Sequence, residues 1–155
     1  MLIERKKIFV RAALTVLCVL LCGWIFSNSA TPAAGSDAQS SRALIFLQGV
    51  LDGLRIPLTL TVKFVRKTAH FVEYAALGGL LTCCICSYGV RRPQWKAFGI
   101  SAAAAVCDEL IQAVTPGRSC QVSDVLLDTC GAGCGALAFF VLYRLWNRRK
   151  NRALS

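Results

Sequence analysis

The sequence AAAAVCDELIQAVTPGRSC, residues 102–120, begins as an apolar helix and ends in a polar turn. Asp108, Glu109 and Gln112 follow directly on residues that are typical of a membrane span. An ionised side chain costs about 3 kcal/mol or more at the centre of a bilayer. Pro116 and Gly117 predict a turn, after which a second apolar segment begins. We therefore predict two antiparallel spans whose carboxylates lie near one membrane surface, where the cost is lower.

The rest of the chain has the layout of a small polytopic membrane protein. Of its 155 residues 55% are hydrophobic, and the basic residues gather in short clusters between long apolar runs. Four runs, at about 8–26, 69–88, 97–114 and 125–146, approach the ~20 residues that a crossing requires. Small residues are dense in the last three runs and allow helix backbones to approach closely. We predict an all-α membrane protein with four transmembrane helices.

The first apolar run is also compatible with a cleaved signal peptide, because a basic segment precedes it and small residues follow it. The run is long for the apolar core of a signal peptide, and no clear A-x-A site follows closely. We favour a retained helix.

The long connection, residues 27–68, contains a predicted amphipathic helix. Residues 27–41 are rich in Ser, Ala, Gly and Pro and predict a loop. Between residues 42 and 55 the apolar side chains recur at helical spacing, and Pro57 ends the pattern. This segment is too polar to span and is predicted to lie at the membrane interface.

The basic clusters predict the orientation. With four spans, residues 5–7, 91–96 and 144–152 share one side, so we place both termini in the cytoplasm and the 27–68 connection outside. Basic residues in that connection oppose the rule locally, which favours a functional role for them. The net charge of +10 does not indicate nucleic-acid binding, because the basic residues flank apolar runs and no recognition motif accompanies them.

Nine cysteines are present, and eight fall inside or beside apolar runs, where cysteine acts as a small hydrophobe. The CCIC sequence at 83–86 has no matching pair at the spacing of a metal site. We predict that the cysteines pack rather than bind metal.

The predicted topology brings polar residues from three spans to the same outer end. His70 shares a helix face with Glu73 and Tyr74, and the pairs Asp108–Gln112 and Asp124–Asp128 are each one turn apart. Arg66, Lys67 and Arg118 are the expected counter-charges. Ionisable groups within a bilayer are a functional hypothesis by default.

These residues carry a family resemblance. RKTAHFVEYAALGGLL at 66–81 and DELIQAVTPGRSCQVSDVLLDTCGAGCG at 108–135 closely resemble the VanZ-like family of small bacterial membrane proteins, and FSNS at 26–29 is similar to the family's Phe-Ser turn. The resemblance implies a single VanZ-like domain over residues 1–155. It also implies a link to the cell envelope, since the name-giving member is associated with teicoplanin resistance.

Two classes of function remain open. In the first, the outer site binds or acts on a lipid-linked anionic envelope substrate. The candidate catalytic residues are His70, Glu109 and Asp108, with acid–base chemistry by His70 and Glu109. The candidate substrate-binding residues are Lys67, Glu73, Tyr74, Gln112, Arg118, Asp124 and Asp128, of which Arg118 and Lys67 would hold an anionic head group. In the second class the buried charges are structural, and the protein is a non-catalytic scaffold that binds lipid or a membrane partner.

The side chains at the outer end have several expected roles. We expect Glu109 to point inward and one of the two adjacent carboxylates to pair with Arg118 or Lys67. Asp124 is also a candidate helix N-cap, and His70 could instead tie two helices together structurally. Oxygen and nitrogen ligands are available from His70, Glu73, Glu109 and Asp128, but no compact ligand motif fixes a metal, so no metal site is predicted. The expected partners are the lipid bilayer and lipid-linked envelope intermediates.

Overall fold

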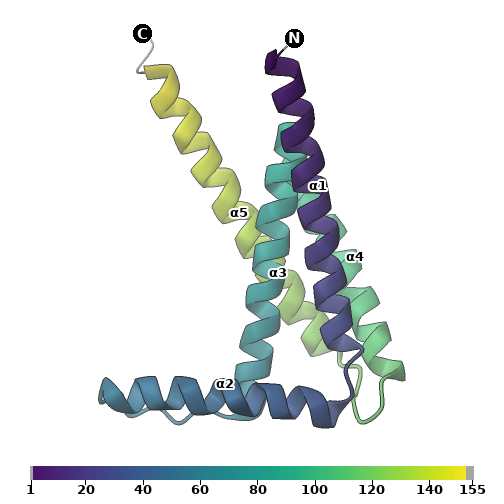
Figure 1. The fold of residues 1–155 in the computed structure, drawn as a ribbon, viewed down its shortest axis with the longest axis vertical. Coiled ribbons are helices and arrows are strands. Elements are labelled where there is room, and N and C mark those ends of the chain that lie inside the picture. Colours follow the sequence, from purple (N-terminus) through teal and green to yellow (C-terminus); the bar gives the residue numbers. More distant parts are fainter. Residues whose placement is uncertain (1, 153–155) are drawn as a thin grey trace.

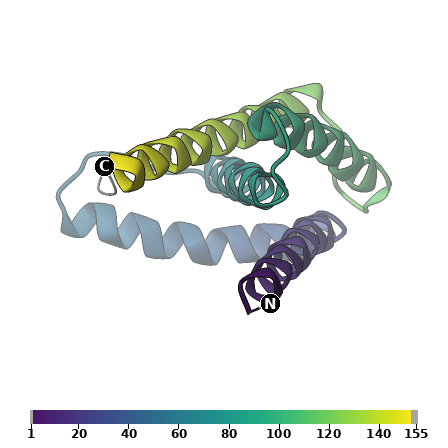
Figure 2. The same cartoon turned by 90° about the horizontal axis from the view of Figure 1, so that it is seen from above.

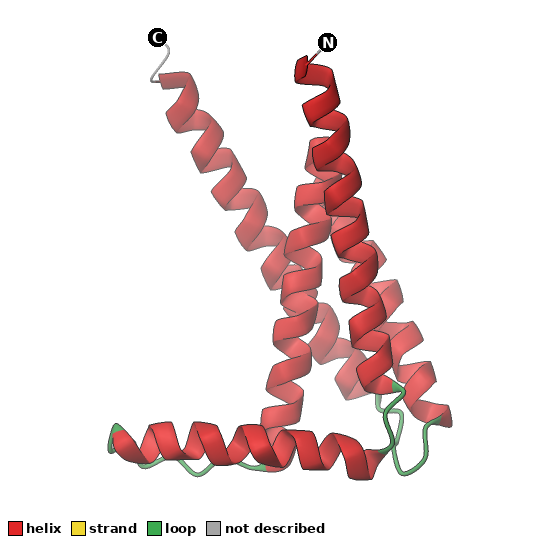
Figure 3. Cartoon of the chain, in the orientation of Figure 1, coloured by secondary structure: helices red, strands yellow, loops and turns green. Residues whose placement is uncertain are grey.

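A computed structural model describes residues 2–152, and within that range the protein consists of five helices joined by short connections (Figure 3). They are α1 (Leu2–Ser29), α2 (Ala33–Gly53), α3 (Val62–Ser87), α4 (Pro93–Val114) and α5 (Val122–Arg152). Four of them, α1, α3, α4 and α5, are long and apolar enough to cross a membrane. The prediction of an all-α polytopic protein with four spans is confirmed. The outermost residues of the predicted 1–155 domain, 1 and 153–155, lie outside the described part.

The two ends of the described chain lie at the same end of the four-helix bundle, and α2 lies across the opposite end (Figure 1). Viewed along the bundle, α3 occupies the centre, with α1 on one side and α5 on the other (Figure 2). The short α3–α4 connection lies at the terminal end, whereas the α4–α5 connection lies at the α2 end.

Close packing of α3 on α5 depends on glycine. A methyl group on Gly78 would overlap the backbone of Ala132, one on Gly131 the backbone of Phe71, and one on Gly135 the backbone of Ala75. Without a hydrophobic driving force between helices in lipid, such close backbone contact supplies the attraction. The small residues that the sequence places in these spans therefore allow the two backbones to touch.

One predicted loop is wrong, and one helix extends beyond the apolar span predicted for it. Residues 33–41, predicted as loop, form the first turns of α2. Pro32 precedes this helix with φ −52°, and the Ala33 N–H donates to the carbonyl of Pro116 at 3.1 Å, so a distant turn stabilises the start of a helix with little apolar periodicity. Helix α3 begins at Val62, before the apolar span predicted from about residue 69, and the Thr61 hydroxyl caps it by accepting the Phe64 N–H at 3.2 Å.

The α4–α5 turn positions the α2 end of the bundle. Pro116 and Gly117 occupy its centre, Gly117 has φ +75°, and the Arg118 N–H donates to the Thr115 carbonyl at 3.1 Å. This is the arrangement of a type II turn, which requires positive φ at its third residue. The predicted turn is confirmed, and it returns the chain into α5 directly beside the start of α2.

Candidate functional site

Polar side chains from three helices meet at the α2 end of the bundle. Near that end lie His70 in α3, Asp108 and Glu109 in α4, and Asp128 in α5. The antiparallel order of the spans produces this meeting, because α3 and α5 begin where α1 and α4 end. The structure thus brings together residues that are far apart in the sequence, as the topology predicts.

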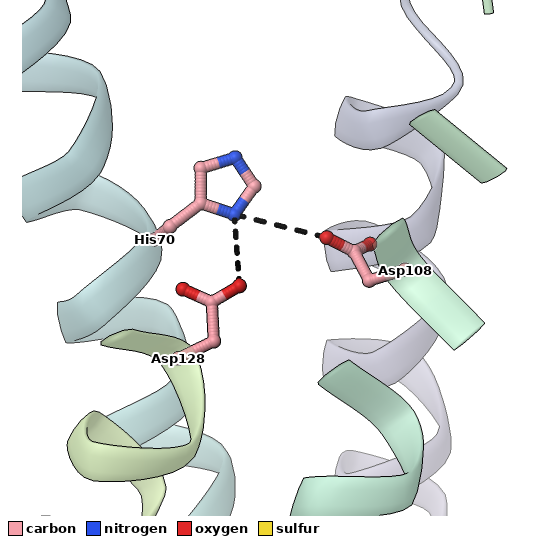
Figure 4. A group of neighbouring side chains, drawn as sticks. All are labelled: His70, Asp108 and Asp128. Carbon is pink, nitrogen blue, oxygen red and sulfur yellow. Dashed lines mark ion pairs between the residues drawn. The ribbon is translucent and has the colours of Figure 1, made fainter. Parts of the chain in front are cut away.

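At the centre of the site is a His–Asp–Asp cluster, formed by His70, Asp108 and Asp128 (Figure 4). The Nδ1 of His70 lies 3.9 Å from Oδ2 of Asp108 and 3.9 Å from Oδ2 of Asp128. Both carboxylates are buried, with 0% and 2% of their side chains exposed. The cluster therefore brings two buried acids and one mostly buried imidazole together from three helices.

Asp108 is held from two sides. Its Oδ2 accepts a hydrogen bond from the Ser29 hydroxyl at 2.8 Å and another from the Gln112 side-chain amide at 3.1 Å. Ser29 is fully buried and is the last residue of α1. Sequence reasoning did not select Ser29 as a site residue, although it belongs to the FSNS turn that carries part of the family resemblance.

Glu109 points to a different partner. Its Oε2 accepts the backbone N–H of Gln121 at 2.8 Å, which ties α4 to the connection before α5. Asp108, and not Glu109, faces His70 in the cluster. Adjacent helical residues point about 100° apart, so the two carboxylates contact different groups. Glu109 lines the cavity described next, which agrees with the expectation that it is the inward carboxylate.

A cavity of about 300 Å³ opens above the cluster. His70, Asp128 and Glu109 line it on the acidic side. Four basic side chains also line it, which we call the basic rim: Lys63, Arg66, Lys67 and Arg118. The cavity thus has an acidic, imidazole-containing floor and a cationic rim.

Among the described residues, no cation of the rim forms an ion pair with Asp108 or Asp128. Lys67 pairs with Asp124, and Arg66 pairs with Asp37 at 2.9 Å. The predicted pairing of Arg118 with a carboxylate of α4 is wrong. Its guanidinium donates to the carbonyls of Thr31 and Asn28, each at 3.0 Å.

The charge of Arg118 and the position of Asp124 complete the description of the rim. Desolvation, with the positive charge of Arg66 nearby, lowers the pKa of Arg118 from its ordinary value, but a guanidinium stays protonated in proteins. Asp124 lies inside the first turn of α5, which begins at Val122. Asp124 is therefore not the residue that precedes the helix, as an N-cap would be, and it pairs with Lys67.

Comparison with known proteins bears on this geometry. The VanZ/LLP1 family matches residues 14–144, a segment that contains every site residue described above. The chain belongs to the VanZ/LLP1 family. No curated protein and no solved structure matches it.

Two further residues predicted to line the site of this VanZ/LLP1 protein lie at its edge. Glu73 turns toward α1, where its Oε1 accepts hydrogen bonds from Trp24 at 3.2 Å and Asn28 at 3.1 Å. Tyr74 is fully buried in the apolar core with Ile25. Its hydroxyl has no hydrogen-bond partner among the described residues.

Chemically, the VanZ/LLP1 site combines two capacities. The basic rim suits an anionic oxygen, since guanidinium and ammonium groups bind phosphate and carboxylate through charge-assisted hydrogen bonds. The floor offers an imidazole between two carboxylates, a set that can exchange protons or bind a cation. His70 and Asp128 line the same cavity as the basic rim.

Proposed function

We propose that this VanZ/LLP1 membrane protein binds a lipid-linked anionic molecule of the cell envelope at the α2 end of its bundle. The observation that carries the proposal is a continuous change from polar to apolar lining along one path. This path begins at the basic rim and ends in a groove between α2 and α3.

Three hollows share walls along this path. The cavity under the basic rim shares Arg66, His70 and Arg118 with a second hollow of about 200 Å³. That hollow in turn shares Ala43 and Val65 with a groove of about 390 Å³ between α2 and α3. The polarity of the path matches an amphiphile with an anionic head group.

The groove supports a hydrocarbon tail as the occupant of the far end. Its lining is almost wholly apolar and includes Leu47 of α2 and Phe64 and Val72 of α3. It adjoins the lipid-facing surface, where Phe64 and Val72 are exposed. A tail placed there would leave the head group within reach of Arg66 and Arg118.

We further propose that this end faces outward and that bound envelope lipid underlies a link to glycopeptide susceptibility. The basic clusters at the terminal end of the bundle favour this orientation. Catalysis by His70, Asp108 and Glu109 stays a prediction.

A lipid-binding measurement tests the proposal. We expect the purified protein to bind a polyprenyl phosphate or phosphatidylglycerol in preference to zwitterionic phosphatidylcholine, as measured by native mass spectrometry from detergent. Lys67→Gln and Arg118→Gln should each weaken binding of the anionic lipid about tenfold, because a charge-assisted hydrogen bond contributes ~1.5 kcal/mol or more. The same variants at equal protein levels should change teicoplanin susceptibility of the expressing cells.

The matched controls lie at the other end of the bundle. Lys96→Gln and Arg91→Gln remove equal charge from exposed residues beside the start of α4 and should leave binding unchanged. Equal affinity for anionic and zwitterionic lipids in the wild type, or equal losses in both sets of variants, would contradict a specific head-group site. That result would favour the scaffold alternative, in which the buried charges are structural.

A further inference from the structure

We infer that the His–Asp–Asp cluster is a binding site for a divalent metal cation. His70 offers a ring nitrogen, and Asp108 and Asp128 each offer a carboxylate oxygen, all within 4.8 Å of one another (Figure 4). Nitrogen and oxygen ligands lie about 2.1 Å from a bound zinc ion, so the ligand atoms of one ion are ~3.5 Å apart. The observed separations of 3.9 Å from Nδ1 to each carboxylate approach this spacing.

Unpartnered buried atoms point to a ligand at this position. The side chain of Asp128 is 2% exposed and receives no hydrogen bond from any described residue. Nδ1 of His70 and Oδ1 of Asp108 are likewise buried without hydrogen-bond partners in the described chain. Buried charges in proteins are paired or coordinate metals.

The local basic residues do not supply the missing charge. Within residues 2–152, the ion-pair contacts of Asp108 and Asp128 are with His70 alone. Lys67, Arg66 and Arg118 are held by Asp124, by Asp37 and by backbone carbonyls. A divalent cation would neutralise both carboxylates at once and would use the imidazole as a neutral ligand.

The donor set and its surroundings indicate the class of ion. Imidazole with carboxylates suits Zn²⁺ or Mn²⁺, and no thiol belongs to the cluster. Ser29 and Gln112 orient Asp108 by hydrogen bonds, which is the role that residues around metal ligands commonly have. His70 and Asp128 line the cavity, so a bound ion would have a coordination position open to water or to an anionic oxygen.

This ligand set differs from the four possible ligands named from the sequence, which are His70, Glu73, Glu109 and Asp128. Glu73 is turned to α1 and Glu109 to Gln121, while Asp108 takes the place that either could have filled. The inference does not depend on lipid binding, because all three ligands come from the protein.

Electron paramagnetic resonance with Mn²⁺ as the probe tests the site. His70 is the sole histidine among 155 residues, so any imidazole signal on bound Mn²⁺ must come from it if purification avoids a polyhistidine tag. We expect the wild type, in detergent without added lipid, to bind Mn²⁺ and to give imidazole ¹⁴N modulation in the electron spin-echo signal. The modulation should vanish in His70→Gln, and Asp128→Asn should weaken Mn²⁺ affinity about tenfold or more, as changes at metal sites do.

Asp52→Asn is the control, since Asp52 is an exposed acid on α2 that bonds Gln48. It should keep both affinity and modulation. Wild-type protein that fails to bind Mn²⁺ at millimolar concentration, or binds it without nitrogen modulation, would overturn the inference even if the variants failed to fold. Because no lipid is present, that failure is separate from a failure of the lipid-binding proposal.

Discussion

Asp108 lies where side chains of α1, α3 and α5 approach α4. It lies in α4, accepts a hydrogen bond from Ser29 of α1, and faces His70 of α3 and, through it, Asp128 of α5. A carboxylate with no freedom to reach solvent depends on these donors, because an unmet hydrogen bond in a buried setting costs about 1–3 kcal/mol.

Ser29→Ala therefore removes a donor from a buried carboxylate without changing the helix that carries it. We expect a loss of stability of about 1 kcal/mol or more, since hydrogen bonds between helices in membranes contribute ~1 kcal/mol. The measurement is thermal unfolding of the purified protein in detergent, followed by tryptophan fluorescence. Ser27→Ala is the control, because Ser27 is exposed on the same helix turn. Equal melting temperatures for the two variants would show that Ser29 does not support Asp108.

At this scale the sequence predicts which residues meet but not how they pair. Helical spacing separates the directions of Asp108 and Glu109 by ~100°, but it does not fix how α4 is rotated about its axis. That rotation depends on packing against α3, α5 and α1, the last of which supplies Ser29. Likewise Arg118 donates to backbone carbonyls at and just after the end of α1. Every residue has a backbone carbonyl, so the positions of charged residues in the sequence cannot identify such acceptors.

Among the elements, the α3–α5 contact determines how near His70 can come to Asp128. The two backbones touch along Gly78, Gly131 and Gly135, and His70 lies one residue before Phe71, whose carbonyl meets Gly131. Any group that separates the helices must also widen the cluster.

Gly135→Ala tests this dependence. The added methyl would overlap the Ala75 carbonyl, so α3 and α5 must shift apart, and overpacking of this kind costs about 1–3 kcal/mol. We expect a lower melting temperature in detergent. Gly99→Ala is the matched control, because nothing lies within 4 Å of a Cβ there and alanine favours a helix more than glycine. A melting temperature for Gly135→Ala equal to that of Gly99→Ala would contradict the close-contact role.

The long apolar runs predict the four spans because length and hydropathy suffice for them. Hydropathy misses the first turns of α2 and α3 for a local reason. Residues 33–41 lack an apolar stripe, and residues 62–68 carry Lys63, Arg66 and Lys67, so hydropathy stops before either helix does. The structure adds what hydropathy omits, namely the Thr61 cap and the Pro116 carbonyl that accepts the first N–H of α2.

The molecule as a whole separates its charged features between two ends. The described chain begins and ends together at one end, and the cavity, α2 and the α4–α5 turn occupy the other (Figure 1). If the terminal end is cytoplasmic, as the basic clusters predict, the cavity opens to the outside. An exposed cysteine at that end, Cys120, gives a direct means of determining the orientation.

We expect a variant that keeps Cys120 as its sole cysteine to react with a membrane-impermeant maleimide in intact cells. Desolvation and the neighbouring carboxylate of Glu109 raise the pKa of the Cys120 thiol. The thiolate is the reacting form, so labelling should be slow at neutral pH and accelerate as the pH rises. Glu109→Gln removes the neighbouring negative charge, which should lower that pKa and speed labelling at neutral pH.

The comparison position is Arg91→Cys in the same cysteine-free background, since Arg91 is exposed near the start of α4 at the terminal end. It should react after permeabilisation and not before. The reverse pattern, with residue 91 labelled from outside and Cys120 protected, would place the cavity toward the cytoplasm. An anionic lipid would then have to reach the basic rim from the inner leaflet, so the labelling result also decides which leaflet supplies the molecule that this cavity binds.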